Sequence, residues 1–261
     1  MCDVCGCGDP ARVKVATTRA AIDVNAPLLS DNDRRAHALR ARFSVQGVTA
    51  LDVMGSPGSG KTALIEATAR ALGPGVRLAA VSGDLATALD AERLARAGVA
   101  SAPITTGSAC HLDARMIEGA LAQGSLAESV ASADVFFIEN VGNLVCPAIY
   151  DLGQHRNVVL LSVTEGVDKP LKYPVMFERA DVVVLTKIDL LPHLPEVSIE
   201  AIGDALARVM PRPRLIPLSA RTGDGLETWI AWLEAERAAV RSKKRGLLAP
   251  APLGALGARQ R

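Results

Sequence analysis

Short apolar runs alternate along the chain with longer segments of helix-forming residues. Apolar runs bounded by turn residues are typical of strands that are buried on both faces of a parallel sheet. The pattern therefore predicts an α/β fold with a mostly parallel sheet and helices on both of its faces. The predicted strands cover residues 48–54, 77–82, 102–106, 134–139, 157–163, 181–185 and 213–218, and the predicted helices cover 31–43, 62–72, 86 onward, 110 onward and 226–240.

The segment between the first predicted strand and the helix after it fits G-x-x-x-x-G-K-[ST], the phosphate-binding loop of P-loop NTPases. Its glycines would let backbone N–H groups and the helix N-terminus surround an anion. Lys61 would neutralise the β- and γ-phosphates, and the Thr62 hydroxyl would bind Mg²⁺. The alternative is a turn that only connects strand and helix, but the order strand, loop, Lys-Thr, helix favours a nucleoside triphosphate site. The predicted nucleotide-binding residues here are Gly55, Pro57, Gly58, Ser59, Gly60, Lys61 and Thr62.

A second motif, [N/T]-K-x-D, follows the strand predicted at 181–185 and predicts guanine recognition. The Asp189 carboxylate would accept hydrogen bonds from two guanine donors that adenine does not present, and the stem of Lys187 would pack over the base. Thr186 stands where Asn is usual. We expect this change to lose an amide that tethers the base edge to the phosphate loop, which weakens nucleotide binding but keeps its specificity. Ser219-Ala220 resembles the S-A-x loop that contacts the guanine O6. A strand end with solvated charges is the alternative.

Acidic residues also end two of the predicted strands. Asp84 is a candidate for the Mg²⁺ shell or for positioning water, or alternatively for capping the next helix, in which Asp90 reads as a surface charge. Glu139 is placed where P-loop enzymes carry a carboxylate on the Mg²⁺ side, and Gly142 where a backbone N–H senses the γ-phosphate. The predicted catalytic residues are Lys61, Asp84, Glu139 and Gly142.

The five cysteines are clustered, which in a cytosolic chain favours metal ligation over disulfides. Cys2, Cys5 and Cys7 put three thiolates on a short flexible segment that suits Zn²⁺, Cu⁺ or Ni²⁺, with the terminal amine as a possible fourth donor. The alternatives are an incidental cysteine-rich terminus or a redox C-x-x-C pair. A second set, Cys110, His111 and Cys146, would supply three ligands if the fold brings them together.

Composition limits the remaining possibilities. Only 3% of the 261 residues are aromatic, so Ala, Val and Leu must fill the core. A net charge of +1 gives no argument for nucleic acid or an anionic membrane as partner. Neither a secretory signal nor a membrane-spanning run is evident, so we expect a cytoplasmic protein. The predicted organisation is a metal-binding motif at 1–8, a linker at 9–30, a GTPase domain at 31–240 and a disordered basic tail at 241–261.

Taken together, five motifs closely resemble the HypB family, the GTPases that support nickel insertion during [NiFe]-hydrogenase maturation. The motifs are C-x-x-C-G-C at 2–7, the phosphate loop at 55–62, G-x-x-C-H-L at 107–112, the segment 138–147 and the segment 168–174. The resemblance implies a GTPase of the signal-recognition-particle/MinD class that dimerises with nucleotide. It also implies a nickel site at Cys2, Cys5 and Cys7, and a second Ni²⁺ or Zn²⁺ site at Cys110, His111 and Cys146. The implied partners are a HypA-type metallochaperone and the hydrogenase large subunit.

We therefore predict a GTP-switched nickel metallochaperone that uses GTP/GDP, Mg²⁺ and Ni²⁺. Hydrolysis is expected to be slow because no arginine finger is evident and Asn140 is a poor analogue of a water-orienting Gln. The histidine-rich storage segment of some members of the family is absent, so bulk nickel storage is not expected. Rival readings are a urease-type nickel GTPase, a Ni/Zn-sequestering protein with a regulatory nucleotide site, and an ATP-dependent small-molecule kinase.

Overall fold

Seven parallel strands form the centre of the computed structural model, which describes residues 19–84, 87–107, 109–122 and 124–248. Their order in the sheet is β3-β2-β4-β1-β5-β6-β7, and every paired strand runs parallel to its neighbour. The predicted sheet is therefore confirmed. The strands are β1 (Thr49–Gly55), β2 (Leu78–Asp84), β3 (Ala100–Thr105), β4 (Val135–Glu139), β5 (Arg156–Ser162), β6 (Val182–Thr186) and β7 (Leu215–Pro217).

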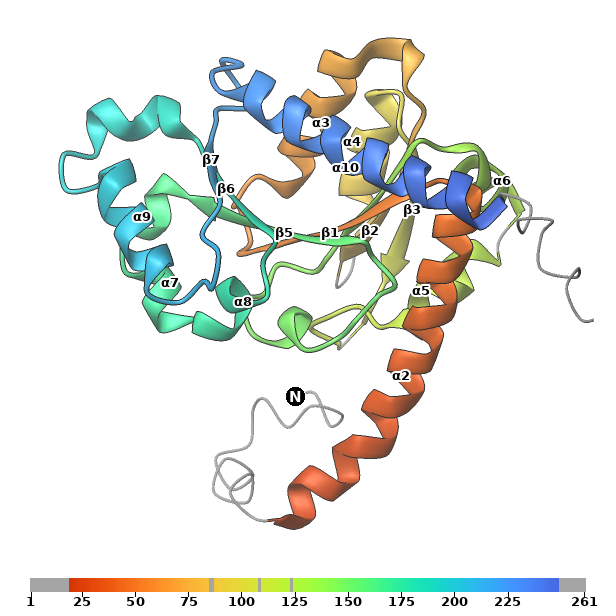
Figure 1. The fold of residues 1–261 in the computed structure, drawn as a ribbon. Helices are drawn as coiled ribbons and strands as arrows, with labels where there is room; N and C mark the ends of the chain where they lie inside the picture. Colours follow the sequence, from red (N-terminus) through yellow and green to blue (C-terminus); the bar gives the residue numbers. More distant parts are fainter. Residues whose placement is uncertain (1–18, 85–86, 108, 123, 249–261) are drawn as a thin grey trace, which may run out of the picture.

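Helices cover both faces of this sheet (Figure 1). Alternate residues of β1 point to opposite faces, so Leu51 and Val53 pack under α3, α4 and α10, whereas Ala50 packs under α2, α5 and α6. A third apolar cluster, which includes Met54, lies under α8 and α9. The helices are α2 (Arg19–Gln46), α3 (Lys61–Leu72), α4 (Leu89–Arg96), α5 (Ala114–Leu121), α6 (Gly124–Ser132), α7 (Lys169–Lys172), α8 (Pro174–Glu178), α9 (Ile199–Ala207) and α10 (Leu226–Leu248), with 3₁₀ turns η1 (Gly73–Gly75), η2 (Cys146–Ala148), η3 (Val163–Glu165) and η4 (Ile188–His193).

The carboxyl ends of the strands meet at one edge of the sheet. Register pairs Val53 of β1 with Glu139 of β4, and Asp84 ends the neighbouring strand β2. In open parallel sheets this edge is where ligands bind. The candidate catalytic residues of the sequence are therefore gathered at one edge by the register of the strands.

Three predicted boundaries are wrong. Helix α2 begins at Arg19, so the segment 9–30 is helical in its last part instead of being a linker throughout. Helix α10 continues to Leu248, so residues 241–248 are not a disordered tail. Arg241 donates to Asp134 (2.6 Å), and Lys244 donates to the carbonyl oxygen of Gln46 (2.7 Å), which holds this basic end of α10 against the domain. The predicted metal motif at 1–8 and residues 249–261 lie outside the described residues.

The third correction concerns the segment that carries Cys110. The helix predicted from residue 110 begins instead at Ala114, where the Asp113 carboxylate caps it by accepting from the Met116 backbone N–H (2.7 Å). Cys110, His111 and Leu112 are consequently left in a loop.

Across the described residues, no helix combines the length and the apolar character that a membrane crossing would need.

Trp229 fixes α10 to α3. Its side chain is fully buried, and its indole Nε1–H donates to the Thr68 hydroxyl (2.8 Å), which in turn donates to the Leu64 carbonyl oxygen (2.7 Å). The indole also stacks on Trp232, with 5.1 Å between the ring centroids. One side chain therefore joins two helices through packing and through a completed chain of hydrogen bonds.

We predict that Trp229→Ala lowers the free energy of unfolding by about 3–5 kcal/mol, because it removes a large buried side chain and leaves a cavity. Thr228→Ala is the matched control, because Thr228 is exposed one position earlier in α10 and its loss is expected to stay within about 0.5 kcal/mol. Urea denaturation followed by circular dichroism measures both. Equal losses in the two variants would contradict this account of the α10–α3 packing.

Candidate functional site

A cavity of about 500 Å³ lies at the carboxyl edge of the sheet. It is lined by the phosphate loop, the end of β2, the first turns of α4 and residues 139–142. Gly58 and Gly60 have φ values of 74° and 100°, a region that favours glycine, so the loop can bend around a ligand. All four predicted catalytic residues, Lys61, Asp84, Glu139 and Gly142, line this one cavity.

Lys61 is almost fully buried at the base of the cavity. Its ammonium donates to the carbonyl oxygens of Gly55 (3.3 Å) and Ser56 (3.2 Å). Burial lowers the pKa of Lys61, while the nearby Glu139 carboxylate acts in the opposite direction. An anionic phosphate in the cavity would supply the negative charge that keeps this buried ammonium protonated.

Two carboxylates converge on the Thr62 hydroxyl. Its Oγ1 lies 2.6 Å from Glu139 Oε1 and 3.0 Å from Asp90 Oδ1, and burial raises the pKa of Glu139. A hydroxyl carries one proton and cannot donate to both acids at once. A hydroxyl and two carboxylate oxygens directed at one point are ligands that suit Mg²⁺, so the residues present fit that ion.

Asp90 and Arg93 are site residues that the sequence did not reveal. Asp90 was expected to be a surface charge, but the first turn of α4 points it at Thr62. Arg93, one turn later, also lines the cavity and is held by Glu66 (2.7 Å) and Asp90 (3.3 Å). Only one feature of the sequence could have indicated them: both lie in the first turns of the helix that follows β2, a strand that ends at the nucleotide cavity. Asp84 does not cap that helix, which begins at Leu89; it accepts from the Thr87 hydroxyl instead.

At the base-reading end, Thr186 does not break the tether to the phosphate loop. Its hydroxyl donates to the Ser59 carbonyl oxygen (2.6 Å), so the connection to the loop persists without an amide, and the weaker nucleotide binding expected from Thr186 stays a prediction. The Asp189 carboxylate accepts from the Ser219 hydroxyl (2.6 Å) and from Arg221 Nε (3.0 Å), and the Ser219 bond lowers the pKa of Asp189. An ionised carboxylate with two acceptor oxygens is what guanine's donor pair requires. Lys187 lies between β6 and the turn that carries Asp189, and its backbone has a left-handed conformation with φ at 61°.

The second cysteine set is brought together by the fold. One ligand atom from each of Cys110, His111 and Cys146 lies within 4.8 Å of the others, and the two sulfurs are 3.0 Å apart. His111 is buried and stacks on Tyr150, with 4.0 Å between the ring centroids. Burial lowers the pKa of His111, which favours the neutral imidazole that can bind a metal. Two thiols and one imidazole form a donor set that suits Ni²⁺ or Zn²⁺.

Comparison with known proteins places the chain. Residues 49–215 match the family model described as the CobW/HypB/UreG nucleotide-binding domain. The hydrogenase maturation factor HypB of Rhizobium leguminosarum bv. viciae is 50% identical over 224 residues, which cover 85% of this chain and 73% of that one. This chain belongs to the HypB family.

Solved HypB structures agree with this assignment. A crystal structure of HypB from Helicobacter pylori in complex with nickel has a TM-score of 0.75 and 39% identity, and the match covers 80% of this chain and 96% of that one. HypB from Archaeoglobus fulgidus has a TM-score of 0.73 and 38% identity over 80% of this chain and 100% of that one. The P-loop GTPase fold and the family that the sequence predicts are both confirmed.

In this HypB-family chain, one segment touches both candidate sites. A Cβ added to Gly142 would lie 2.8 Å from Pro57 Cγ and 2.9 Å from the Pro57 backbone nitrogen. The next residue, Asn143, pairs with Gly55 in an antiparallel β-bridge. Cys146 follows in η2, so the segment that packs on the phosphate loop also carries a candidate metal ligand.

Asn140 lines the nucleotide cavity, but its side chain is buried and its amide is hydrogen-bonded within the protein. Its Nδ2 donates to Asp52 Oδ1 (3.1 Å), and its Oδ1 accepts from the backbone N–H groups of Leu112 (3.2 Å) and Val141 (3.0 Å). Asp52 is fully buried in β1, and burial raises its pKa to about 8 despite the hydrogen bond from Asn140. The sequence did not reveal this network.

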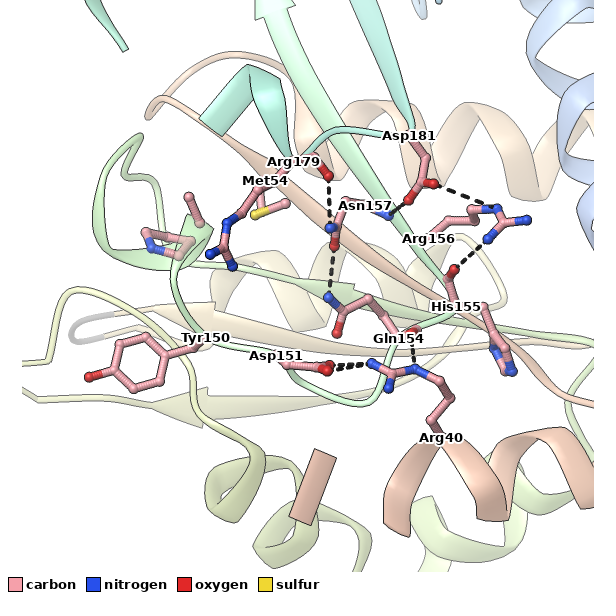
Figure 2. A pocket seen from close by; sticks show the side chains of 12 residues that line it. Arg40, Met54, Tyr150, Asp151, Gln154, His155, Arg156, Asn157, Arg179 and Asp181 are labelled. Carbon is pink, nitrogen blue, oxygen red and sulfur yellow. Dashed lines mark hydrogen bonds and ion pairs between the residues drawn. The ribbon is translucent and has the colours of Figure 1, made fainter. Parts of the chain in front are cut away.

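A second, polar cavity of about 290 Å³ is lined by residues of the segment 147–157 together with Arg40, Arg179 and Asp181 (Figure 2). Its side chains bond to one another: Arg40 pairs with Asp151 (2.6 Å), and Gln154 Nε2 donates to Asn157 (2.7 Å). Asn157 in turn donates to the Arg179 carbonyl oxygen (2.9 Å). These contacts hold residues 147–157 between α2 and α8, which fixes the far end of the segment that begins at Glu139.

We predict that Gly142→Ala weakens GDP binding about tenfold, about 1.4 kcal/mol, because the new methyl group must displace Pro57 in the phosphate loop. Gly119→Ala is the matched control, since a Cβ there meets nothing within 4 Å. Isothermal titration calorimetry with GDP measures the affinity of both variants. Wild-type affinity in Gly142→Ala would contradict the tight packing of these segments.

A second prediction concerns Asp52, whose pKa is raised from 3.8 to about 8. Between these values the folded protein holds a proton that the unfolded chain releases, so this carboxyl lowers the stability as the pH rises. Asp52→Asn cannot titrate. The free energy of unfolding of the variant, relative to wild type, is therefore expected to increase from pH 4 to pH 8 and then level off. Parallel stability curves from urea denaturation would contradict a neutral Asp52.

Proposed function

We propose that this protein is a GTP-hydrolysing nickel metallochaperone whose nucleotide state controls how it holds Ni²⁺ for insertion into [NiFe]-hydrogenase. The observation that carries the proposal is the run from Glu139 to Cys146, which begins at the Thr62 hydroxyl, packs on the phosphate loop at Gly142 and ends among the metal ligands. A movement at the γ-phosphate would therefore reach the metal ligands without crossing another element.

In the nucleotide site, Lys61 and the loop N–H groups would hold the phosphates, and Asp189 with Lys187 would read guanine. Thr62, Glu139 and Asp90 would hold Mg²⁺, which supplies positive charge to the β- and γ-phosphates. Asp84 lines the same cavity and would position water or complete the shell of the ion. Arg93 is an additional cation at the cavity wall. Hydrolysis would be slow because the Asn140 amide is already bonded to Asp52 and Leu112, which leaves it poorly placed to orient an attacking water.

In the metal site, Cys110, His111 and Cys146 would bind Ni²⁺ as cargo, with Zn²⁺ as the competing ion. Three ligands leave positions open for a donor from a second copy or from an acceptor protein. The exposed apolar side chains of Val145 and Ile149 flank Cys146, which suits a contact surface there. A nucleotide-dependent homodimer, a HypA-type metallochaperone and the hydrogenase large subunit are the proposed partners, in the cytoplasm. The nickel site predicted at Cys2, Cys5 and Cys7 stays a prediction.

The test is a Ni²⁺ titration of the reduced full-length protein with GDP and with a non-hydrolysable GTP analogue. In the variant Cys2→Ala/Cys5→Ala/Cys7→Ala, we expect one remaining site whose affinity differs between the nucleotides by roughly 5–150-fold, the usual range of coupling between sites. Adding Cys146→Ala is expected to abolish that difference while GDP affinity stays unchanged.

Two controls give the result its meaning. GTP turnover above background separates a GTPase from a sequestering protein with a regulatory nucleotide site, and competition between ATP and GTP separates it from a kinase. Equal Ni²⁺ affinity in both nucleotide states of the protein with intact Cys110, His111 and Cys146 would disprove the switch. A preference for Zn²⁺ over Ni²⁺ at both sites would leave a metal-binding GTPase with another cargo.

A further inference from the structure

We propose that the Asn140 side chain, held by Asp52, is the link that carries the nucleotide state to the Cys110–His111 half of the metal site. The inference rests on the proposed function, because it concerns how the two sites of that function are coupled. The direct route from Gly142 reaches Cys146 only. The other two ligands lie in a loop between β3 and α5, so a separate connection must reach them.

Asn140 is positioned to make that connection. It directly follows Glu139 at the end of β4, where its backbone N–H donates to the Val53 carbonyl oxygen (3.0 Å). Its side-chain Oδ1 accepts at once from the N–H of Val141, beside Gly142, and from the N–H of Leu112, beside His111. One oxygen atom therefore joins the segment at the phosphate loop to the segment at the metal ligands.

Leu112 transmits the position of this bond because it cannot move independently. Its side chain is fully buried, and a Cβ added to Gly83 in β2 would lie 3.0 Å from it. On the chain it sits between His111 and the Asp113 cap of α5. A shift of the Leu112 N–H toward or away from Asn140 must therefore be taken up by the preceding residues, Cys110 and His111.

Asp52 sets the orientation of the amide. The Asn140 NH₂ group donates to both Asp52 oxygens, at 3.1 and 3.4 Å, and this leaves the amide oxygen facing the two backbone N–H groups. If the amide rotated by half a turn, its NH₂ would face two donors, and three buried polar groups would lose their partners. An acceptor at position 52 is thus required for the link to form.

The two routes together act on both halves of the metal site. When a γ-phosphate engages the Gly142 N–H, Val141 moves with it. The Val141 and Leu112 N–H groups both donate to Asn140 Oδ1, so a change in the first hydrogen bond alters the second. Cys146 is displaced along the chain, and Cys110 and His111 are displaced through Leu112. Without the Asn140 link, only one of the three ligands would respond to the nucleotide.

The experiment compares Asp52 variants in the Cys2→Ala/Cys5→Ala/Cys7→Ala full-length protein. Asp52→Asn keeps an acceptor for the Asn140 NH₂ group and is expected to keep the wild-type ratio of Ni²⁺ affinities between GDP and the GTP analogue. Asp52→Ala removes the acceptor, and the ratio is expected to fall several-fold toward one, because only Cys146 then still responds to the nucleotide. Thr49→Ala is the matched control, because it also truncates a buried polar side chain of β1 but does not touch Asn140. GDP affinity should be unchanged in all three variants.

Backbone amide exchange gives an independent readout of the same bond. The Leu112 N–H is expected to exchange faster in Asp52→Ala, while its rate in Asp52→Asn and Thr49→Ala stays at the wild-type value. If Asp52→Ala does not fold, Asn140→Leu takes its place, since its side chain has a similar size but no oxygen to accept from the Leu112 N–H. Urea denaturation checks the fold of each variant.

The outcomes separate the link from the function beneath it. If the Ni²⁺ affinities with GDP and with the GTP analogue are equal when Asp52 and Asn140 are unchanged, both the nucleotide switch and the link are overturned. An affinity ratio above one that is as large in Asp52→Ala or Asn140→Leu as in the wild type, with the Leu112 N–H still protected from exchange, overturns the link and leaves the switch. A smaller ratio together with loss of Leu112 protection in these variants, with both at their wild-type values in Asp52→Asn and Thr49→Ala, supports the link.

Discussion

The contact between Gly142 and Pro57 is the constraint on which the arrangement of both sites depends. Parallel pairing of β1 with β4 brings the ends of these strands to one edge, and the chain then has to leave β4 directly over the phosphate loop. A side chain at position 142 would overlap Pro57, so only glycine allows the two segments to touch. Close packing of this kind cannot deform gradually, and a displacement of one segment therefore displaces the other.

Ligands of opposite charge would stabilise the buried charged groups of the nucleotide cavity. Lys61 and Glu139 are both buried, and burial shifts the pKa of each toward its uncharged form. Thr62 faces two acids with one proton to share. An anionic phosphate beside Lys61 and a divalent cation among the carboxylates would reverse both penalties at once, so nucleotide and Mg²⁺ are expected to bind together and to hold the loop more rigidly.

Local sequence patterns were sufficient to predict those parts of the two sites that are formed by residues close together in the sequence. The phosphate loop, the strand ends at Asp84 and Glu139 and the pairing of Cys110 with His111 could all be read directly. What failed depends on distant partners. Asp90 and Arg93 face the cavity because of how α4 is rotated on the sheet, and helix α10 extends past residue 240 because acceptors on Asp134 and Gln46 receive its basic side chains. Asn140 bonds to Asp52, 88 positions earlier, and no local pattern relates the two.

The end of β4 shows why the two sites are so closely connected. Within eight residues the chain places a carboxylate at the Thr62 hydroxyl, an amide on Leu112, a glycine on the phosphate loop and a thiol at the metal ligands. Each of these groups is fixed by a different neighbour, whereas the backbone between them is continuous and its far end is held by the contacts of residues 147–157. A segment fixed at both ends has few ways to move. The coupling that we propose would then follow from where β4 ends, since a ligand that repositions Gly142 would also alter the surroundings of Cys146.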